Sequence, residues 1–310
     1  MPDEFKHCAL LAVNTIKKAI ENYKLGNQQH CQINNECNNN CDACTKDSCT
    51  ESKDMQQQIK HKIAVLSGKG GVGKSTIAVN LAFALSSAGY KVGLMDVDIH
   101  GPSIPTLLNL RNISIQSDHT GISPVEIGNL KVISIGFFLE NNDDPIIWRG
   151  PMKMGIINQF LHDVKWGNLD FLIIDLPPGT GDEPLSIGQS FSKQDAAVIV
   201  TTPQEVATAD VRKSINFCRE LKLSILGIIE NMSGFICPKC KEVTHIFGSD
   251  GGKLLADAFN IPLLGEIPID PAIVSSSDKG VSYTDAYADS ETAKIFARIV
   301  DSILQRIESD

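Results

Sequence analysis

Hydrophobic and polar positions are arranged along most of the chain in blocks that have the lengths of strands and helices. From residue 60 onward, longer stretches of helical character separate short apolar runs, which are Ile63–Leu66, Lys91–Met95, Val132–Ile135, Phe171–Ile174, Ala196–Val200 and Ile225–Ile229. Alternation of this kind is typical of a mostly parallel sheet with helices on both faces. The pattern therefore predicts an α/β fold whose ligand site lies at the carboxyl ends of the strands.

The N-terminal part of the chain follows a different pattern. Apolar residues between Phe5 and Tyr23 recur mostly at three- and four-residue steps, which predicts an amphipathic helix within residues 1–25. Residues 26–59 contain few apolar residues besides cysteine, so this segment is expected to be a flexible tether unless a metal folds it. We therefore expect a helix at 1–25, a Cys-rich segment at 26–59 and a folded domain at 60–310.

Composition narrows the classes of protein to which this chain can belong. Of its 310 residues, 42% are hydrophobic and 21% charged, which is enough apolar material for a sizeable core. The formal net charge of −9 disfavours broad attraction to nucleic acid or anionic lipid, so any phosphate site must be local. No apolar run approaches the roughly 18 residues that span a bilayer, and residues 1–25 lack the pattern of an export signal. We expect a cytoplasmic protein that binds neither membrane nor nucleic acid.

A glycine-rich segment follows the first predicted strand and precedes a helical stretch at Ile77–Ser86. It fits the phosphate-loop motif G-x-x-x-x-G-K-[ST] in the strand, loop and helix context that the motif requires. Its glycines let backbone N–H groups face a phosphate chain, Lys74 reaches the β and γ phosphates, and Ser75 ligates Mg²⁺. The expected nucleotide-binding residues are Gly68, Lys69, Gly70, Gly71, Val72, Gly73, Lys74, Ser75 and Thr76.

Lys69 places a second cation inside the phosphate loop. With this lysine the segment resembles the deviant Walker A, or signature-lysine, ATPases, a group that includes MinD, ParA and the nitrogenase iron protein. In that group the equivalent lysine reaches across a dimer interface to the nucleotide of the other subunit. The resemblance therefore implies a catalytic role for Lys69, a MinD-like fold and a nucleotide-sandwich homodimer.

Acidic segments at 96–98 and 175–182 each follow a predicted strand. Phosphoryl transfer needs acids near Mg²⁺ and near the attacking water. By motif match, Asp98 would orient the water and join Lys74 in catalysis, and Asp175 would support Mg²⁺. The Asn-Lys-x-Asp motif of most GTP-selective relatives is absent, and Asn231 follows a strand where related ATPases bind adenine. We therefore expect ATP as the nucleotide.

Cys237 and Cys240 form a Cys-Pro-Lys-Cys motif in which two thiolates are close enough to share one metal centre. Tetrahedral zinc or a cubane cluster needs about four ligands, and this motif supplies two per chain. Three interpretations follow from the spacing. Two copies of the chain can meet around a bridging [4Fe–4S] cluster, His245 and another group can complete a zinc site, or the pair can be a reduced turn without metal.

Further motifs give this chain a more specific resemblance. Together with the cysteine pair they look like the Mrp/ApbC family of ATP-binding iron–sulfur cluster carriers, over essentially Ile63–Ser282. The motifs are KGGVGKST at 69–76, DIHGPS at 98–103, WRGPM at 148–152, DLPPGTGD at 175–182 and ENMSGF at 230–235. The resemblance implies an ATPase in which Cys237 and Cys240 hold a [4Fe–4S] cluster at the dimer interface for transfer to apo iron–sulfur proteins.

The Cys-rich segment is a candidate for a second cluster. Its five cysteines are Cys31, Cys37, Cys41, Cys44 and Cys49. They resemble the N-terminal cluster site of the eukaryotic cytosolic branch of the family, although the gap before the Cys41 and Cys44 pair is shortened here. The segment also looks like the short Cys-rich leaders of archaeal members, and we expect an archaeal-type member. A metal-free tether is the alternative.

Two other classes of protein compete with the carrier interpretation. A MinD- or ParA-like positioning ATPase would use a basic helix on membranes or a basic surface on DNA. The last predicted helix, Ile295–Ile307, has an apolar face but mixes acids and bases on its polar face, which favours packing in the core. The second competitor is an electron-transfer reductase like the nitrogenase iron protein, which is also a cluster-bridged dimer.

Overall fold

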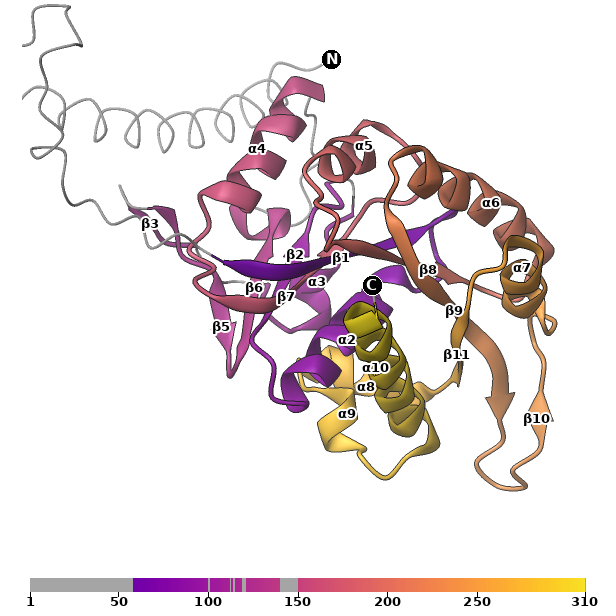
Figure 1. The fold of residues 1–310 in the computed structure, drawn as a ribbon. Coiled ribbons are helices and arrows are strands. Elements are labelled where there is room, and N and C mark those ends of the chain that lie inside the picture. The colour runs from indigo at the N-terminus through magenta and orange to yellow at the C-terminus, as the bar shows by residue number, and fades with distance from the viewer. Residues whose placement is uncertain are drawn as a thin grey trace, which may run out of the picture.

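The computed structural model describes residues 58–99, 101–111, 113, 115–118, 121–139 and 150–309. A single mixed sheet of nine strands runs through the middle of this described part (Figure 1). The predicted helix at 1–25 and almost all of the Cys-rich segment lie outside it. So do His100, Trp148 and Arg149 of the family motifs.

The sheet has the order β10-β9-β8-β1-β7-β2-β6-β5, with β11 paired to β9. Pairs among β9, β8, β1, β7, β2 and β6 are parallel, as is the pair of β11 with β9, whereas β5 and β10 run antiparallel to their neighbours. The strands are β1 (Ile59–Ser67), β2 (Val92–Asp96), β5 (Val125–Ile127), β6 (Leu130–Ser134), β7 (Leu169–Asp175), β8 (Ala196–Thr201), β9 (Ser224–Ile236), β10 (Val243–Thr244) and β11 (Leu263–Ile269). A separate hairpin pairs β3 (Ser117–Asp118) with β4 (Gly121–Ile122).

Helices cover both faces of this sheet (Figure 1). One face carries α4 (Gly150–His162), α5 (Asp182–Gln189), α6 (Glu205–Glu220) and α7 (Gly251–Phe259). The other carries α2 (Lys74–Ser87), α3 (Ile104–Leu107), α8 (Pro271–Lys279), α9 (Tyr283–Ala286) and α10 (Glu291–Ser309). A short 3₁₀ helix, η2 (Ile135–Phe138), follows β6. The predicted α/β architecture is therefore confirmed.

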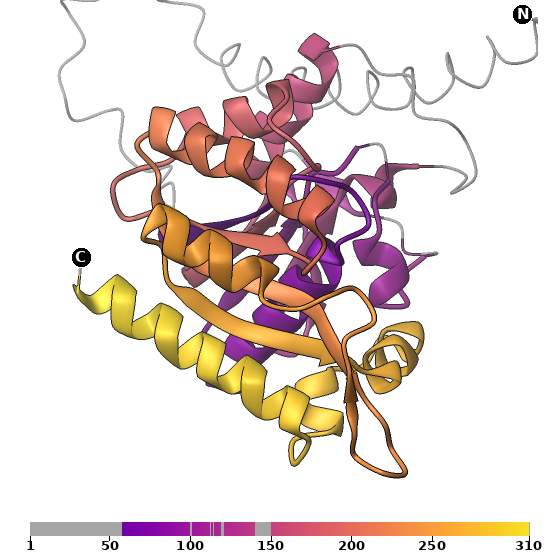
Figure 2. The ribbon, with the colours of Figure 1, turned by 90° about the vertical axis from the view of Figure 1, so that its right-hand side faces the viewer.

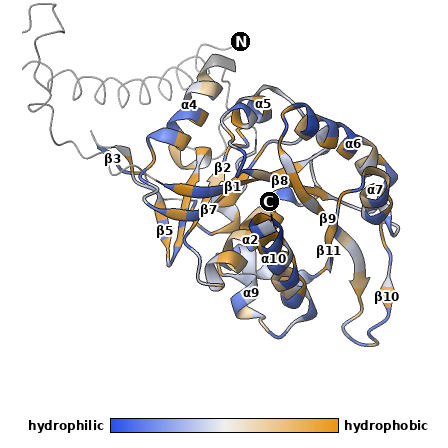
Figure 3. Ribbon diagram, in the orientation of Figure 1, coloured by the Kyte–Doolittle hydropathy of each residue, from blue (hydrophilic) through white to orange (hydrophobic). Residues whose placement is uncertain are grey.

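Each of the apolar runs identified in the sequence forms a strand of the sheet. The central strands β7 and β8 are buried almost throughout, and β1 is buried from Ile63 to Ser67, which matches the apolar runs in their sequences. The helices differ from the strands in this respect. In Figure 3 hydrophobic colours follow β8 and β9, while α6 and α10 carry both hydrophobic and hydrophilic colours. Phe296, Ile299 and Ile303 of α10 are fully buried, so its apolar face packs in the core as expected. None of the described helices is both long and apolar enough to cross a membrane.

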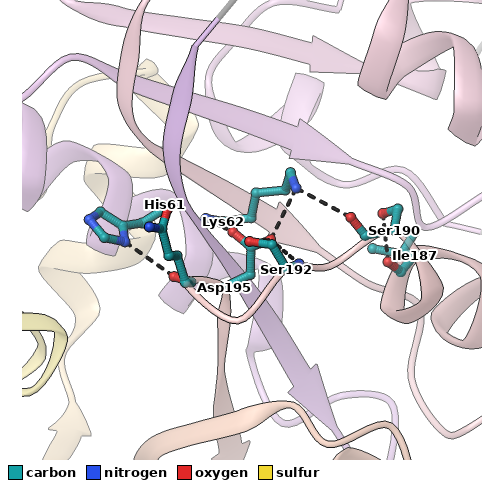
Figure 4. A network of polar contacts seen from close by, with 7 residues as sticks. His61, Lys62, Ile187, Ser190, Ser192 and Asp195 are labelled. Carbon is teal, nitrogen blue, oxygen red and sulfur yellow. Dashed lines mark hydrogen bonds and ion pairs between the residues drawn. The ribbon is translucent and has the colours of Figure 1, made fainter. Parts of the chain in front are cut away.

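A polar network joins β1 to the segment before β8 at the amino ends of the strands (Figure 4). The buried carboxylate of Asp195 accepts hydrogen bonds from the backbone N–H of Lys62 (2.8 Å) and of Ser192 (2.6 Å). Lys62 Nζ lies 3.0 Å from the same carboxylate, and His61 Nδ1 lies 3.1 Å from the Gln194 carbonyl oxygen. This network fixes β1 at the end of the sheet opposite the phosphate loop.

Candidate nucleotide site and cysteine hairpin

The phosphate loop connects the end of β1 to the start of α2, as the motif requires. Gly71 and Gly73 have positive φ angles of 84° and 82°, a backbone region that residues with a Cβ adopt at a cost. These conformations let the chain curl and then enter α2 at Lys74. Lys69, Gly70 and Gly71 are exposed, so this side of the loop is open to a ligand.

Gly68 has a different role, which is close packing. A Cβ on this residue would lie 2.4 Å from backbone atoms of Asp210 and Val211 in α6. Real Cβ atoms essentially never come so near, so glycine is required for α6 to approach the phosphate loop. The first glycine of the motif thus sets the distance between the loop and a helix on one face of the sheet.

Lys74 and Asp175 form a buried ion pair at the carboxyl end of the sheet. Lys74 Nζ lies 2.5 Å from Asp175 Oδ1, and the residues are 6% and 0% exposed. Burial raises the pKa of Asp175, although the charge of Lys74 opposes this shift. Asp175 Oδ2 is buried and has no hydrogen-bond partner among the described residues. An unpaired carboxylate oxygen beside the Ser75 hydroxyl fits the oxygen ligands that Mg²⁺ prefers.

Asp96 organises the loop that carries Asp98, a role that the sequence did not indicate. It faces Asp175 in the register of β2 and β7, and burial, followed by the charge of Asp175, raises its pKa to about 8. Its carboxylate accepts hydrogen bonds from Ser134 Oγ (2.8 Å) and from the backbone N–H of Asp98 (3.1 Å) and Ile104 (3.4 Å). Asp98 itself is half-buried, near the carboxyl ends of β2 and β7.

Asn231 lies within β9 and not after a strand as the sequence predicted, because β9 continues to Ile236, and its side chain contacts the phosphate loop. Its side-chain Nδ2 donates a hydrogen bond of 2.9 Å to the Val72 carbonyl oxygen, and the residue is 8% exposed. A Cβ on Gly73 would lie 2.3 Å from the same nitrogen. The absence of a side chain at Gly73 therefore makes room for the Asn231 amide as well as permitting the turn.

The cysteine motif occupies the turn of the hairpin formed by β9 and β10. Cys237 N–H donates to the Glu242 carbonyl and Lys241 N–H donates to the Cys237 carbonyl, both at 2.9 Å. Cys237 is half-buried and Cys240 exposed, and the hairpin projects from the domain in both views (Figure 1, Figure 2). The pKa of the Cys237 thiol is lowered, mainly by the backbone N–H of Cys240 and then by that of Lys239.

No third metal ligand joins the cysteine pair in the described part of the chain. Among these residues no group of three or more His, Cys, Asp or Glu side chains is arranged to hold a metal ion. His245, the candidate third ligand for zinc, lies with Nδ1 3.0 Å from the Ser233 carbonyl oxygen. The five N-terminal cysteines lie outside the described residues. Cys218, in contrast, is buried in α6, and burial raises its pKa to about 12.

A parallel sheet, a phosphate loop between β1 and α2, and a buried lysine–aspartate pair together define a P-loop NTPase. Comparison with known families agrees and is more specific. The chain belongs to the family described as NUBPL iron-transfer P-loop NTPase, whose model matches residues 58–304. This confirms the family that the sequence motifs predicted.

Characterised relatives are similar over most of their length. An iron–sulfur cluster carrier protein of Methanococcus maripaludis is 46% identical over 288 residues, which are 89% of this chain and 99% of the relative. A cytosolic Fe–S cluster assembly factor NUBP2 homolog of Dictyostelium discoideum is 52% identical over 250 residues, 79% of this chain and 94% of the relative.

Solved structures show the same fold. A nucleotide-binding protein of Archaeoglobus fulgidus, in complex with ADP, is 43% identical, with a TM-score of 0.63 over 73% of this chain and 88% of its own. The cell division ATPase MinD of Pyrococcus furiosus is 24% identical, with a TM-score of 0.57 over 80% of this chain and all of its own. The second likeness supports the fold alone, which is MinD-like as predicted.

Proposed function

We propose that this protein is an ATP-hydrolysing carrier that binds a [4Fe–4S] cluster and transfers it to apo iron–sulfur proteins in the cytoplasm. The observation that carries the proposal is the hairpin: the half-buried Cys237 and the exposed Cys240 lie in a turn that projects from the same strand that contacts the phosphate loop. The M. maripaludis relative is named an iron–sulfur cluster carrier and the D. discoideum relative a cytosolic Fe–S cluster assembly factor, which supports the carrier part of the proposal.

The residues of the nucleotide site divide the work of hydrolysis. Backbone N–H groups of the loop and the Lys74 ammonium hold the phosphates of ATP, and Asn231 would bind adenine, as the family resemblance implies. Ser75 and Asp175 would hold Mg²⁺, which neutralises charge on the phosphates. Asp98, in the loop tied to Asp96, orients the water that attacks the γ phosphorus as ADP leaves. Lys69 is exposed and free of the core, as a residue reaching a second subunit must be.

The cluster is cargo, and the hairpin is built to bind it and release it. A thiol whose pKa is lowered by neighbouring N–H groups is more readily converted to the thiolate that ligates iron. Each chain offers two such ligands, so two chains in a homodimer supply the number that one cluster needs. An exposed site at a dimer interface lets an apo-protein approach the cluster. The N-terminal cysteines are proposed as a second cluster site.

Two observations bear on the competing classes. The apolar face of α10 is buried in the core, so it is not free to bind a membrane as in a MinD-like positioning ATPase. An iron-protein-like reductase shares the proposed dimer and cluster, and only its chemistry separates it from a carrier. A carrier loses its cluster to an acceptor, whereas a reductase keeps the cluster and cycles it by one electron.

Cluster transfer tests the proposal directly. The protein is reconstituted anaerobically with iron and sulfide, mixed with an apo iron–sulfur enzyme in the presence of ATP, and separated from it again. We expect iron and sulfide to leave this protein and the enzyme to gain activity. Reversible one-electron redox cycling coupled to ATP, with the cluster retained, would support the reductase instead.

A further inference from the structure

We propose that Asn231 is a positioning residue through which nucleotide at the phosphate loop controls the cysteine hairpin. The inference rests on the proposed function, because it connects the nucleotide site to the cysteine pair that is proposed to hold the cluster. It concerns a role separate from adenine binding, and it follows from contacts on both faces of β9. Those contacts connect the phosphate loop, the strand and the helix that follows the hairpin.

The first contact joins β9 to the phosphate loop. The Asn231 amide donates to the Val72 carbonyl at 2.9 Å, in a buried position, and occupies the space left by the missing side chain of Gly73. Val72 belongs to the loop whose N–H groups are expected to turn toward the phosphates. A bound nucleotide that orders this loop therefore also fixes the carbonyl oxygen to which Asn231 is bonded.

The second contact joins the preceding residue of β9, Glu230, to α7, the helix that follows the hairpin. Successive side chains of a strand point to opposite faces, so Glu230 points away from the phosphate loop. Glu230 Oε2 accepts a hydrogen bond of 2.5 Å from the N–H of Gly252, in the first turn of α7, and Glu230 is 1% exposed. A Cβ on Gly252 would lie 2.9 Å from Glu230 Cβ, so α7 begins directly against this side chain.

Between these contacts and the cysteines the strand has a distinctive backbone. Met232 has a φ of 58°, the left-handed region that side chains other than glycine adopt rarely. The pairing of β9 with β11 also shifts register, between the Ile267–Asn231 pair and the Ile269–Phe235 pair. Residues 238–246 are exposed, so the hairpin rests on little besides β9 and the start of α7. Under this proposal, the buried side-chain contacts of Glu230 and Asn231 set the orientation of the hairpin.

Thiol reactivity in the metal-free protein measures this connection. Cys237 and Cys240 are alkylated with iodoacetamide with and without saturating ADP, and the peptide that contains them is quantified by mass spectrometry. We expect ADP to slow alkylation by about fivefold or more, the low end of measured couplings between sites. In Asn231→Ala, at ADP concentrations that saturate the variant, the rates with and without ADP should be equal.

Asn80→Ala is the matched control. Asn80 is also buried, and its Nδ2 also donates to a backbone carbonyl, that of Thr76 at 2.8 Å, but this bond stays within α2. The control should keep the ADP effect. A residue that only supported the fold would change the alkylation rate equally in both conditions. If ADP acts within one chain, its effect on the alkylation rate should be the same at low and high protein concentration. If a second copy of the chain covers the cysteines, the effect should grow with protein concentration.

Three results would overturn the inference: no effect of saturating ADP on the wild-type rates, an undiminished effect in Asn231→Ala, or an effect that appears only at high protein concentration. If Asn231→Ala does not bind ADP, Glu230→Ala tests the connection from the other face of β9. That variant leaves the phosphate loop intact and should bind ADP without protecting the cysteines; retained protection would contradict the inference. Because no iron is used, the result is independent of whether the protein carries a cluster.

Discussion

At the scale of single residues, Lys74 supplies the buried positive charge of the nucleotide site. Its ammonium is almost fully buried, and its carboxylate partner, Asp175, has a second oxygen without a hydrogen bond. Buried charges persist only when they are paired. The pair therefore places a cation at the phosphate loop and leaves one carboxylate oxygen without a hydrogen bond among the described residues, as the proposed Mg²⁺ role of Asp175 requires.

Lys74→Ala should weaken ATP binding because it removes the cation that faces the phosphates. A hydrogen bond to a charged group contributes about 2 to 3 kcal/mol, so the dissociation constant should rise roughly 30- to 150-fold. Equilibrium dialysis with labelled ATP measures the change. Wild-type affinity in this variant would remove Lys74 from the nucleotide site.

Asp98→Asn should slow ATP turnover and leave ATP binding unchanged. The substitution keeps the size of the side chain and leaves the phosphate loop untouched, so ATP affinity should stay near the wild-type value. Turnover should fall by about 100-fold or more, the usual loss when a group that handles the proton of the attacking water is removed. Steady-state phosphate release gives kcat, and an unchanged kcat would contradict the role assigned to Asp98.

The lowered pKa of Cys237 predicts a pH dependence. The thiolate is the reactive form, so alkylation slows as pH falls through the pKa of the thiol. In Cys240→Ser the backbone N–H groups that stabilise the Cys237 thiolate remain, and the midpoint should lie below the ordinary thiol value of 9.0. Alkylation rates from pH 6 to about 10, resolved for the Cys237 peptide, give the midpoint. A midpoint at or above 9.0 would show that these N–H groups do not act on the thiol.

The identities of the loop residues and of Cys237 and Cys240 could be predicted from the sequence because each set lies in a short continuous motif. The contacts that Asp96 and Asn231 make within the fold could not. Asp96 faces Asp175 only because β2 and β7 pair in one register, and Asn231 meets Val72 only because β9 lies near the phosphate loop. Contacts between residues far apart in the chain leave no periodic signal in the sequence.

At the scale of elements, β1 is held at both of its ends. The phosphate loop follows its carboxyl end, and the network around Asp195 fixes its amino end. The central strands were predictable because their apolar runs are rich in β-branched residues and are shorter than a typical helix, which favours a buried strand. The apolar run at Leu263–Ile269 was not identified, since Gly265, Glu266 and Pro268 interrupt it, and β10 is too short to give a pattern.

Asp195→Ala should destabilise the domain without affecting nucleotide binding. It leaves Lys62 without its partner and two backbone N–H groups without their acceptor, which should lower the free energy of unfolding by about 3 kcal/mol. Lys60→Ala is a suitable comparison, because its ion pair with Asp170 is exposed and should contribute less than about 1 kcal/mol. Urea titration of each variant measures both free energies of unfolding. Equal decreases would show that the Asp195 network stabilises the domain no more than an exposed ion pair does.

At the scale of the whole molecule, the carrier account needs a second copy of the chain. The cysteine pair supplies two of the thiolates that a cluster requires, and no third ligand of the usual kinds joins it within the described residues. The exposed Lys69 also points to a partner subunit through the family resemblance. The contacts among the described residues of one chain show neither a partner for the Lys69 side chain nor the remaining cluster ligands. The dimer is therefore predicted from the family resemblance and not from the fold of one chain.

Iron and acid-labile sulfide, counted per dimer beside the native mass, test this account most directly. After anaerobic reconstitution the wild type should be a dimer with about four iron atoms at the hairpins, beyond any held by the N-terminal cysteines. Cys237→Ser should lose that cluster while binding ATP normally, and a double variant that adds Cys41→Ser should hold almost no iron. A reconstituted Cys237→Ser protein that still forms a cluster-bridged dimer would contradict the account.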